Sequence, residues 1–194
     1  MQSHENEETL GDILKSQITV LGLFIAAFWA TEIVDWFMNG ALDRYGVVPR
    51  TVSGLYGILY APFLHGDFPH LISNTVPFAV LGWFVLLQGF WRFFGVYLIT
   101  SVVSGLGTWL IGDSRSVHIG ASGVIFGFLG YLLLGAVFRR SIKSILFSLL
   151  AGVLYGGCIF GVLPGTPGVS WEGHLFGFLG GVLAAKLLAN AKDE

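Results

Sequence analysis

The sequence predicts an all-α polytopic membrane protein, with six transmembrane helices packed around a water-accessible polar cavity and both termini in the cytoplasm. Hydrophobic residues make up 54% of the 194 residues and charged residues only 11%, against about 25% charged residues in soluble domains. Glycine, with 28 residues, has about twice its usual share of ~7%, as in helices that pack backbone to backbone in lipid. Six apolar runs are each long enough to span a bilayer: 17–37, 68–88, 93–111, 120–138, 144–163 and 171–189.

These runs leave no room for a separate soluble domain. We expect a polar cytoplasmic tail over residues 1–16, a membrane domain over 17–189 and a short cytoplasmic tail over 190–194. The first residues lack the positive region of a cleaved signal peptide, so the first span should remain as an anchor. Basic residues predict the orientation of the chain in the membrane, because they concentrate on the cytoplasmic side. Seven lie on the predicted cytoplasmic side: Lys15, Arg92, Arg139, Arg140, Lys143, Lys186 and Lys192. Three lie on the other side: Arg44, Arg50 and Arg115.

The long connection over residues 38–67 falls on the non-cytoplasmic side of this arrangement. Its tyrosines and prolines suit a loop half-embedded at the membrane interface, and loops of this length are usually functional. The protein is expected to be a multi-pass protein of the plasma or inner membrane.

Polar residues inside the predicted spans are few and lie at one depth. His65, His70 and Asn74 stand at the start of the second span, Ser122 at the start of the fourth and His174 at the start of the sixth. Even-numbered spans all run inward from the non-cytoplasmic side, so these five groups should converge. Polar groups at membrane depth are costly unless they face protein or water, and their convergence therefore predicts a reactive site in a cavity.

Glycines recur at helical spacing beside two of these polar residues: Gly173, Gly177 and Gly181 in the sixth span, and Gly123, Gly127 and Gly130 in the fourth. Bare helix faces let two axes approach closely. Such an approach could bring the Ser122 Oγ within ~2.6–3.2 Å of a His174 nitrogen, the distance at which an imidazole activates a serine.

The combined pattern resembles that of the rhomboid intramembrane serine proteases in their basic six-helix form. It consists of three motifs in order, His65-x4-His70-x3-Asn74, Gly120-Ala121-Ser122-Gly123 and Gly173-His174-x2-Gly177-x3-Gly181, and it covers about residues 63–181. Each motif alone is weak, but the three in order form a highly specific combination. The resemblance implies that Ser122 is the nucleophile and His174 the general base. It places His70 and Asn74 in the oxyanion hole, with Ala121 beside the nucleophile as a further oxyanion or binding residue.

No acidic third member of the site is evident, so we expect a Ser–His dyad whose imidazole packs against Phe126, one turn beyond Ser122. The family commonly has a Trp-Arg pair nine residues before the first histidine, and this chain has Tyr56-Gly57 there. Arg50 is available as a lipid or carbonyl contact instead. The expected substrates are transmembrane segments of membrane proteins that unwind near the outer surface.

The sequence leaves three alternatives open. A zinc site would explain the histidines, but there is no HExxH motif and no carboxylate or cysteine at ligand spacing, so we expect no metal and no cofactor. A small transporter would show internal repeats. A catalytically silent rhomboid-like protein would bind transmembrane clients, but it would be expected to lack the serine or the histidine.

The remaining histidines, His65 and His118, are interpreted as structural or solvated residues near the interface. The expected partners are transmembrane substrates and the lipid bilayer, with no nucleic acid.

Overall fold

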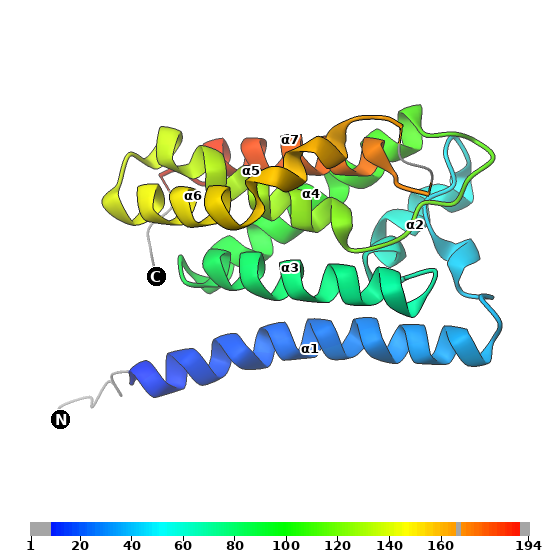
Figure 1. The fold of residues 1–194 in the computed structure, drawn as a ribbon, viewed down its shortest axis with the longest axis horizontal. Coiled ribbons are helices and arrows are strands. Elements are labelled where there is room, and N and C mark those ends of the chain that lie inside the picture. Colours follow the sequence, from blue (N-terminus) through cyan, green and yellow to red (C-terminus); the bar gives the residue numbers. More distant parts are fainter. Residues whose placement is uncertain (1–8, 166–167, 191–194) are drawn as a thin grey trace, which may run out of the picture.

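The computed structural model describes residues 9–165 and 168–190, and its regular elements are all helices apart from one isolated β-bridge. Figure 1 shows them as a bundle, in which the start of the first helix and the end of the last lie at one end. In chain order the elements are α1 (Leu10–Phe37), η1 (Asp43–Tyr45), α2 (Val52–Tyr60), η2 (Ala61–Phe63), α3 (Phe68–Leu86), α4 (Phe90–Ile111), α5 (Ser122–Arg139), α6 (Ile142–Tyr155), η3 (Gly156–Val162) and α7 (Trp171–Leu187).

Five of these helical stretches are long and apolar enough to cross a membrane: α1, α3, α4, α5 and the continuous run of α6 with η3. The sixth predicted span corresponds to α7, which has 17 residues and carries Glu172 in its first turn and Lys186 in its last turn. Length and composition therefore establish a multi-pass chain with five such spans in its described part.

The helix that contains the first predicted span starts earlier than the apolar run, because α1 begins at Leu10 rather than near residue 17. Thr9 caps this helix: its Oγ1 accepts a hydrogen bond from the Asp12 N–H, and the Asp12 carboxylate accepts one from the Thr9 N–H. Such a capping box stabilises a helix start even in polar sequence. Residues 1–8 and 191–194 of the two expected tails lie outside the described residues.

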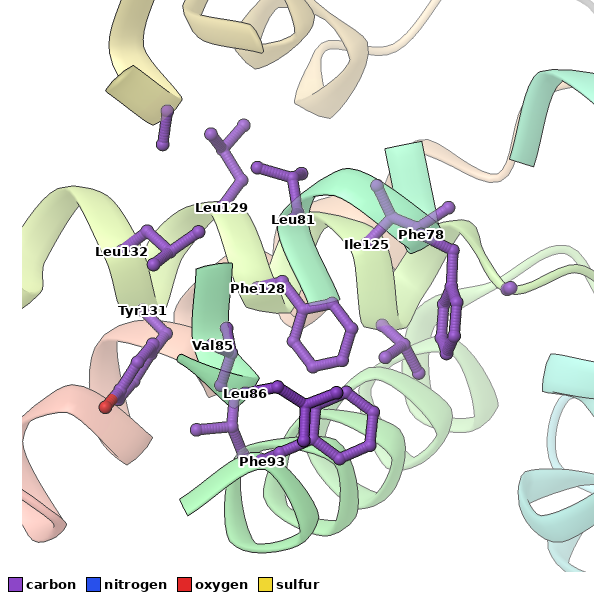
Figure 2. Packing of buried hydrophobic residues seen from close by; sticks show 14 of the residues in the cluster. Phe78, Leu81, Val85, Leu86, Phe93, Ile125, Phe128, Leu129, Tyr131 and Leu132 are labelled. Carbon is purple, nitrogen blue, oxygen red and sulfur yellow. The ribbon is translucent and has the colours of Figure 1, made fainter. Parts of the chain in front are cut away.

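The helix α5 lies at the centre of the bundle and packs against α3, α4, α6 and α7. Its side chains interlock with those of α3 and α4, as Figure 2 shows for Phe78 and Leu81 of α3, Phe93 of α4 and Phe128 of α5. Phe78, Phe93 and Phe128 are fully buried. The residue that begins α5, Ser122, is therefore attached to the most buried of the five candidate spans.

The connection over residues 38–67 is largely structured, with α2 at the end of the bundle opposite the start of α1 (Figure 1). Two glycines of α2 allow a very close approach, because a Cβ on Gly54 would overlap the Val48 carbonyl and one on Gly57 the Gly46 carbonyl. The Arg50 Nη1 donates to the Leu110 carbonyl oxygen at 3.0 Å, so this arginine does contact a carbonyl.

Candidate active site

Ser122 is the first residue of α5, and the glycine two residues earlier makes this position possible. Gly120 has a φ of +111°, which favours glycine. A Cβ at Gly120 would also lie only 2.7 Å from the His70 Nε2. The turn into α5 therefore brings the backbone before Ser122 directly against the His70 imidazole of α3.

His174 lies in the first turn of α7, where the Ser170 hydroxyl caps the helix by accepting the Gly173 N–H. Its Nε2 is 2.8 Å from the Ser122 Oγ. Its Nδ1 is 2.9 Å from the Gly161 carbonyl oxygen in η3. A carbonyl oxygen can only accept, so Nδ1 must carry the proton and Nε2 must present its lone pair to Ser122. This is the tautomer that a general base requires.

The imidazole is held between Phe126 and Gly161. The Phe126 ring stacks on the His174 ring with centroids 4.1 Å apart and an interplanar angle of 11°, as the sequence predicted. A Cβ on Gly161 would lie 2.8 Å from the Phe126 Cζ, so a larger residue would disturb this stack. The carbonyl of Gly161 was not foreseen from the sequence, because a backbone oxygen leaves no residue-type signal.

The glycines of α7 and α5 face one another. A Cβ on Gly177 would overlap the Gly123 carbonyl, and one on Gly181 would overlap the Gly127 carbonyl. On the α4 side, the Ser104 hydroxyl donates to the Gly173 carbonyl oxygen at 2.8 Å. The first turns of α5 and α7 are thus in backbone contact beside the dyad.

His70 and Asn74 line the same cavity as Ser122 and His174. The Asn74 Nδ2 donates one hydrogen bond to the His70 carbonyl oxygen at 2.8 Å, which leaves its second N–H available. Ala121 is fully buried in the hydrophobic core and does not line this cavity.

His65 is also buried, but behind the site. Its ring packs against those of Phe28 and His70, with centroids 5.5 and 5.2 Å away. Burial lowers the pKa of His65 to about 4, with a smaller effect from His70 in the same direction.

The cavity has a volume of about 910 Å³. Asp67, Ser116 and His118 contribute polar groups, and Leu81 and Leu129 contribute apolar surface further along α3 and α5. Such a cavity can accommodate several residues of an extended peptide, with the Ser122 hydroxyl on its wall.

Comparisons with known proteins find matches over most of the chain. The family model of the Rhomboid domain matches residues 52–191. An uncharacterized protein of Mycobacterium tuberculosis is 41% identical over 179 residues, which are 88% of this chain and 75% of that protein. The Bacillus subtilis protein YdcA, named as a candidate rhomboid protease, is 30% identical over 149 residues, 73% of this chain and 72% of its own.

A third relative is rhomboid-like protease 5 of Toxoplasma gondii, 30% identical over 148 residues, which cover 74% of this chain and 17% of that much longer protein. The domain match alone spans more than half of the chain. With its five apolar helices, the chain belongs to the rhomboid family of integral membrane proteins, whose named members include proteases.

Proposed function

We propose that the protein is an intramembrane serine endopeptidase that cleaves transmembrane segments of membrane proteins with a Ser122–His174 dyad. The observation that carries this proposal is the 2.8 Å contact between the Ser122 Oγ and the His174 Nε2. The Gly161 carbonyl fixes the opposite side of the ring. A dyad of this kind needs no carboxylate, since a carbonyl oxygen already selects the tautomer.

Acylation follows from these contacts. The Ser122 Oγ attacks the scissile carbonyl carbon as its proton passes to the His174 Nε2, which forms an imidazolium that still donates from Nδ1 to Gly161. When the tetrahedral intermediate collapses, the C–N bond breaks and His174 gives this proton to the leaving amine. A water molecule then loses a proton to the same nitrogen and attacks the ester, which releases the Ser122 hydroxyl and the new carboxyl terminus.

The oxyanion of each intermediate needs hydrogen-bond donors. The backbone N–H of Ser122 lies in the first turn of α5, where N–H groups have no acceptor within their own helix. The free N–H of Asn74 and the His70 ring, on α3, are the proposed side-chain donors. The buried Ala121 contributes through its place in the turn that aims the Ser122 N–H, rather than through its methyl group.

The position of the site supports a proposal for the substrate class. In the proposed topology α7 is the sixth span, both termini are cytoplasmic and the cavity opens to the non-cytoplasmic side of a plasma or inner membrane. A helix cannot expose its backbone to Ser122 without local unwinding, because its carbonyl groups are already hydrogen-bonded. The preferred substrates are therefore single-pass segments with small or helix-weakening residues near the outer surface.

The test uses the purified protein in detergent. A fluorophosphonate probe, which loses fluoride as its phosphorus bonds to a serine oxygen, should label Ser122, and the His174→Ala variant should lose most of this labelling. A reporter with a single transmembrane segment should be cut by the wild type, and bound but not cut by Ser122→Ala. A folded wild-type sample with no labelling and no cleavage would instead favour a silent, client-binding rhomboid-like protein. Strong inhibition by EDTA would favour a metal site.

A further inference from the structure

A second serine–histidine pair lies next to the dyad, with the two residue types exchanged between the helices. His118 precedes Ser122 by four residues, and Ser170 precedes His174 by four residues. The His118 Nδ1 is 2.7 Å from the Ser170 Oγ. Both pairs therefore join the same two segments, the start of α5 and the start of α7, and each pair is separated by 52 residues along the chain.

The hydrogen bonds of this second pair form one consistent chain. The Ser170 Oγ accepts from the Gly173 N–H, so its own proton is free to go to the His118 Nδ1. On the other side of the ring, Nε2 is 2.8 Å from the Ser116 Oγ, whose hydroxyl donates to the Asp113 carbonyl oxygen at 2.8 Å. The His118 Nε2 therefore carries the proton. Burial lowers the pKa of His118, which favours this neutral form.

The pair connects segments whose relative position decides the dyad geometry. The backbone of His118 is fixed by two hydrogen bonds with Val47, both of 2.9 Å. Ser170 is the residue from which α7 starts, one turn before His174. The glycine contacts set the distance between the axes of α5 and α7, but glycines lack side chains that could fix the rotation of the first turn of α7. The hydrogen bond from Ser170 to His118 supplies such a constraint.

We infer that His118 is a positioning residue, which holds the Ser170 cap of α7 so that His174 stays aligned with Ser122. This inference rests on the proposed function of the dyad. It assigns no proton transfer to Ser170, because its hydroxyl is already occupied by the cap of α7 and by His118.

Two substitutions at His118 separate its two hydrogen bonds. In His118→Asn, the Oδ1 atom can take the place of Nδ1 and accept from Ser170. In His118→Gln, the Nε2 atom can take the place of the ring Nε2 and donate to Ser116, while the bond to Ser170 is lost. Misplacing a catalytic group by about 1 Å can lower the reaction rate about 10²-fold. We therefore expect His118→Gln to lower the maximal rate of fluorophosphonate labelling about 10- to 100-fold, whereas His118→Asn stays within about 3-fold of the wild type.

A second comparison separates positioning from helix capping. Ser170→Ala removes both the cap and the bond to His118, whereas Ser141→Ala removes the side-chain cap of α6, which begins at the opposite end of α5 from Ser122. Losing a helix cap destabilises a protein. Both variants should lower the unfolding midpoint, Ser170→Ala by at least as much as Ser141→Ala because it also loses the bond to His118, and Ser170→Ala alone should slow labelling. Ser170→Thr, which keeps the hydroxyl, should restore the rate.

The labelling kinetics decide among the outcomes. A positioning role predicts a lower maximal rate with an unchanged probe concentration for half-maximal rate. The following outcomes apply if the wild type labels on Ser122. The inference would be overturned if His118→Gln labelled as fast as His118→Asn, or if Ser170→Ala labelled as fast as Ser141→Ala. The proposed function would then remain intact. A folded wild type that does not label at Ser122 would refute the proposed function instead.

Discussion

Replacing Gly177 by alanine tests whether backbone contact between α5 and α7 aligns the dyad. Gly177 lies three residues after His174, and a Cβ there would overlap the carbonyl oxygen and carbonyl carbon of Gly123 and lie 3.1 Å from its Cα. These are backbone atoms of the helix that begins with Ser122, so no flexible side chain can yield. The two helices must separate by about 1 Å before the new methyl group clears 3.0 Å, the shortest approach that real Cβ atoms show.

The expected loss of activity and of stability follows from this separation of the two helices. The Ser122 Oγ and the His174 Nε2 are 2.8 Å apart, so a shift of that size along their line breaks the hydrogen bond. We expect the rate of labelling and of reporter cleavage to fall about 10²-fold. Overpacking costs about 1–3 kcal/mol, which outweighs the gain of about 0.5–1 kcal/mol from replacing a helical glycine by alanine.

Gly22→Ala is the matched control, because it adds the same methyl group to a helix where nothing lies within 4 Å. It should keep wild-type activity and should not lower the unfolding midpoint in detergent. Wild-type labelling in Gly177→Ala would show that the helices tolerate the separation, and the account of how the dyad is aligned would then be incorrect.

Three further predictions concern the surroundings of the dyad. Asn74→Ala should lower kcat about 10²-fold with little change in KM if its free N–H meets the oxyanion only in the transition state; steady-state kinetics with the reporter would show a rise in KM alone if Asn74 were a substrate contact. Gly161→Ala should slow labelling by displacing the Phe126 ring from His174, and labelling at the wild-type rate would mean that the stack does not hold the imidazole. Burial raises the pKa of Asp43 to about 6, and the nearby Asp35 and Asp67 act in the same direction. The ionised carboxylate therefore destabilises the fold above that pH. Asp43→Asn should raise the unfolding midpoint at pH 8. This gain should shrink as the pH falls from about 6 towards 3.8, and a gain that does not depend on pH would contradict the assigned pKa.

The sequence carried most of the information about the bundle and the dyad. Apolar runs located the five helical stretches of the described chain that are long and apolar enough to span a membrane, because lipid leaves few alternatives to a helix of about 20 apolar residues. The spacing of Gly177 and Gly181 predicted a close helix contact, and the order of the motifs placed Ser122 and His174 on neighbouring helices. Phe126 was expected beside the imidazole because it lies one helical turn from Ser122, and residues at this spacing share a helix face.

The details that could not be predicted depend on backbone atoms and on polar side chains in loops. The start of α1 at Leu10 depends on a local capping box, which a search for apolar runs does not detect. The His174 Nδ1 is held by a carbonyl in η3, where α6 continues as a 3-10 helix from Gly156. His118 was interpreted as a structural or solvated loop residue, because only the folded chain brings it to Ser170.

The absence of the usual Trp-Arg pair can be understood from how the long connection is anchored. With Gly57 in place of an arginine, α2 packs directly on the Gly46 carbonyl, a contact that any side chain at this position would block. The end of α4 supplies the polar anchors instead: the Trp109 Nε1 donates to the Thr51 carbonyl oxygen at 2.7 Å, and Arg50 donates to Leu110. The same connection holds the backbone of His118 through Val47. A change in the packing of α2 therefore has a direct structural route, through the backbone of this loop, to the residue that we infer aligns the dyad.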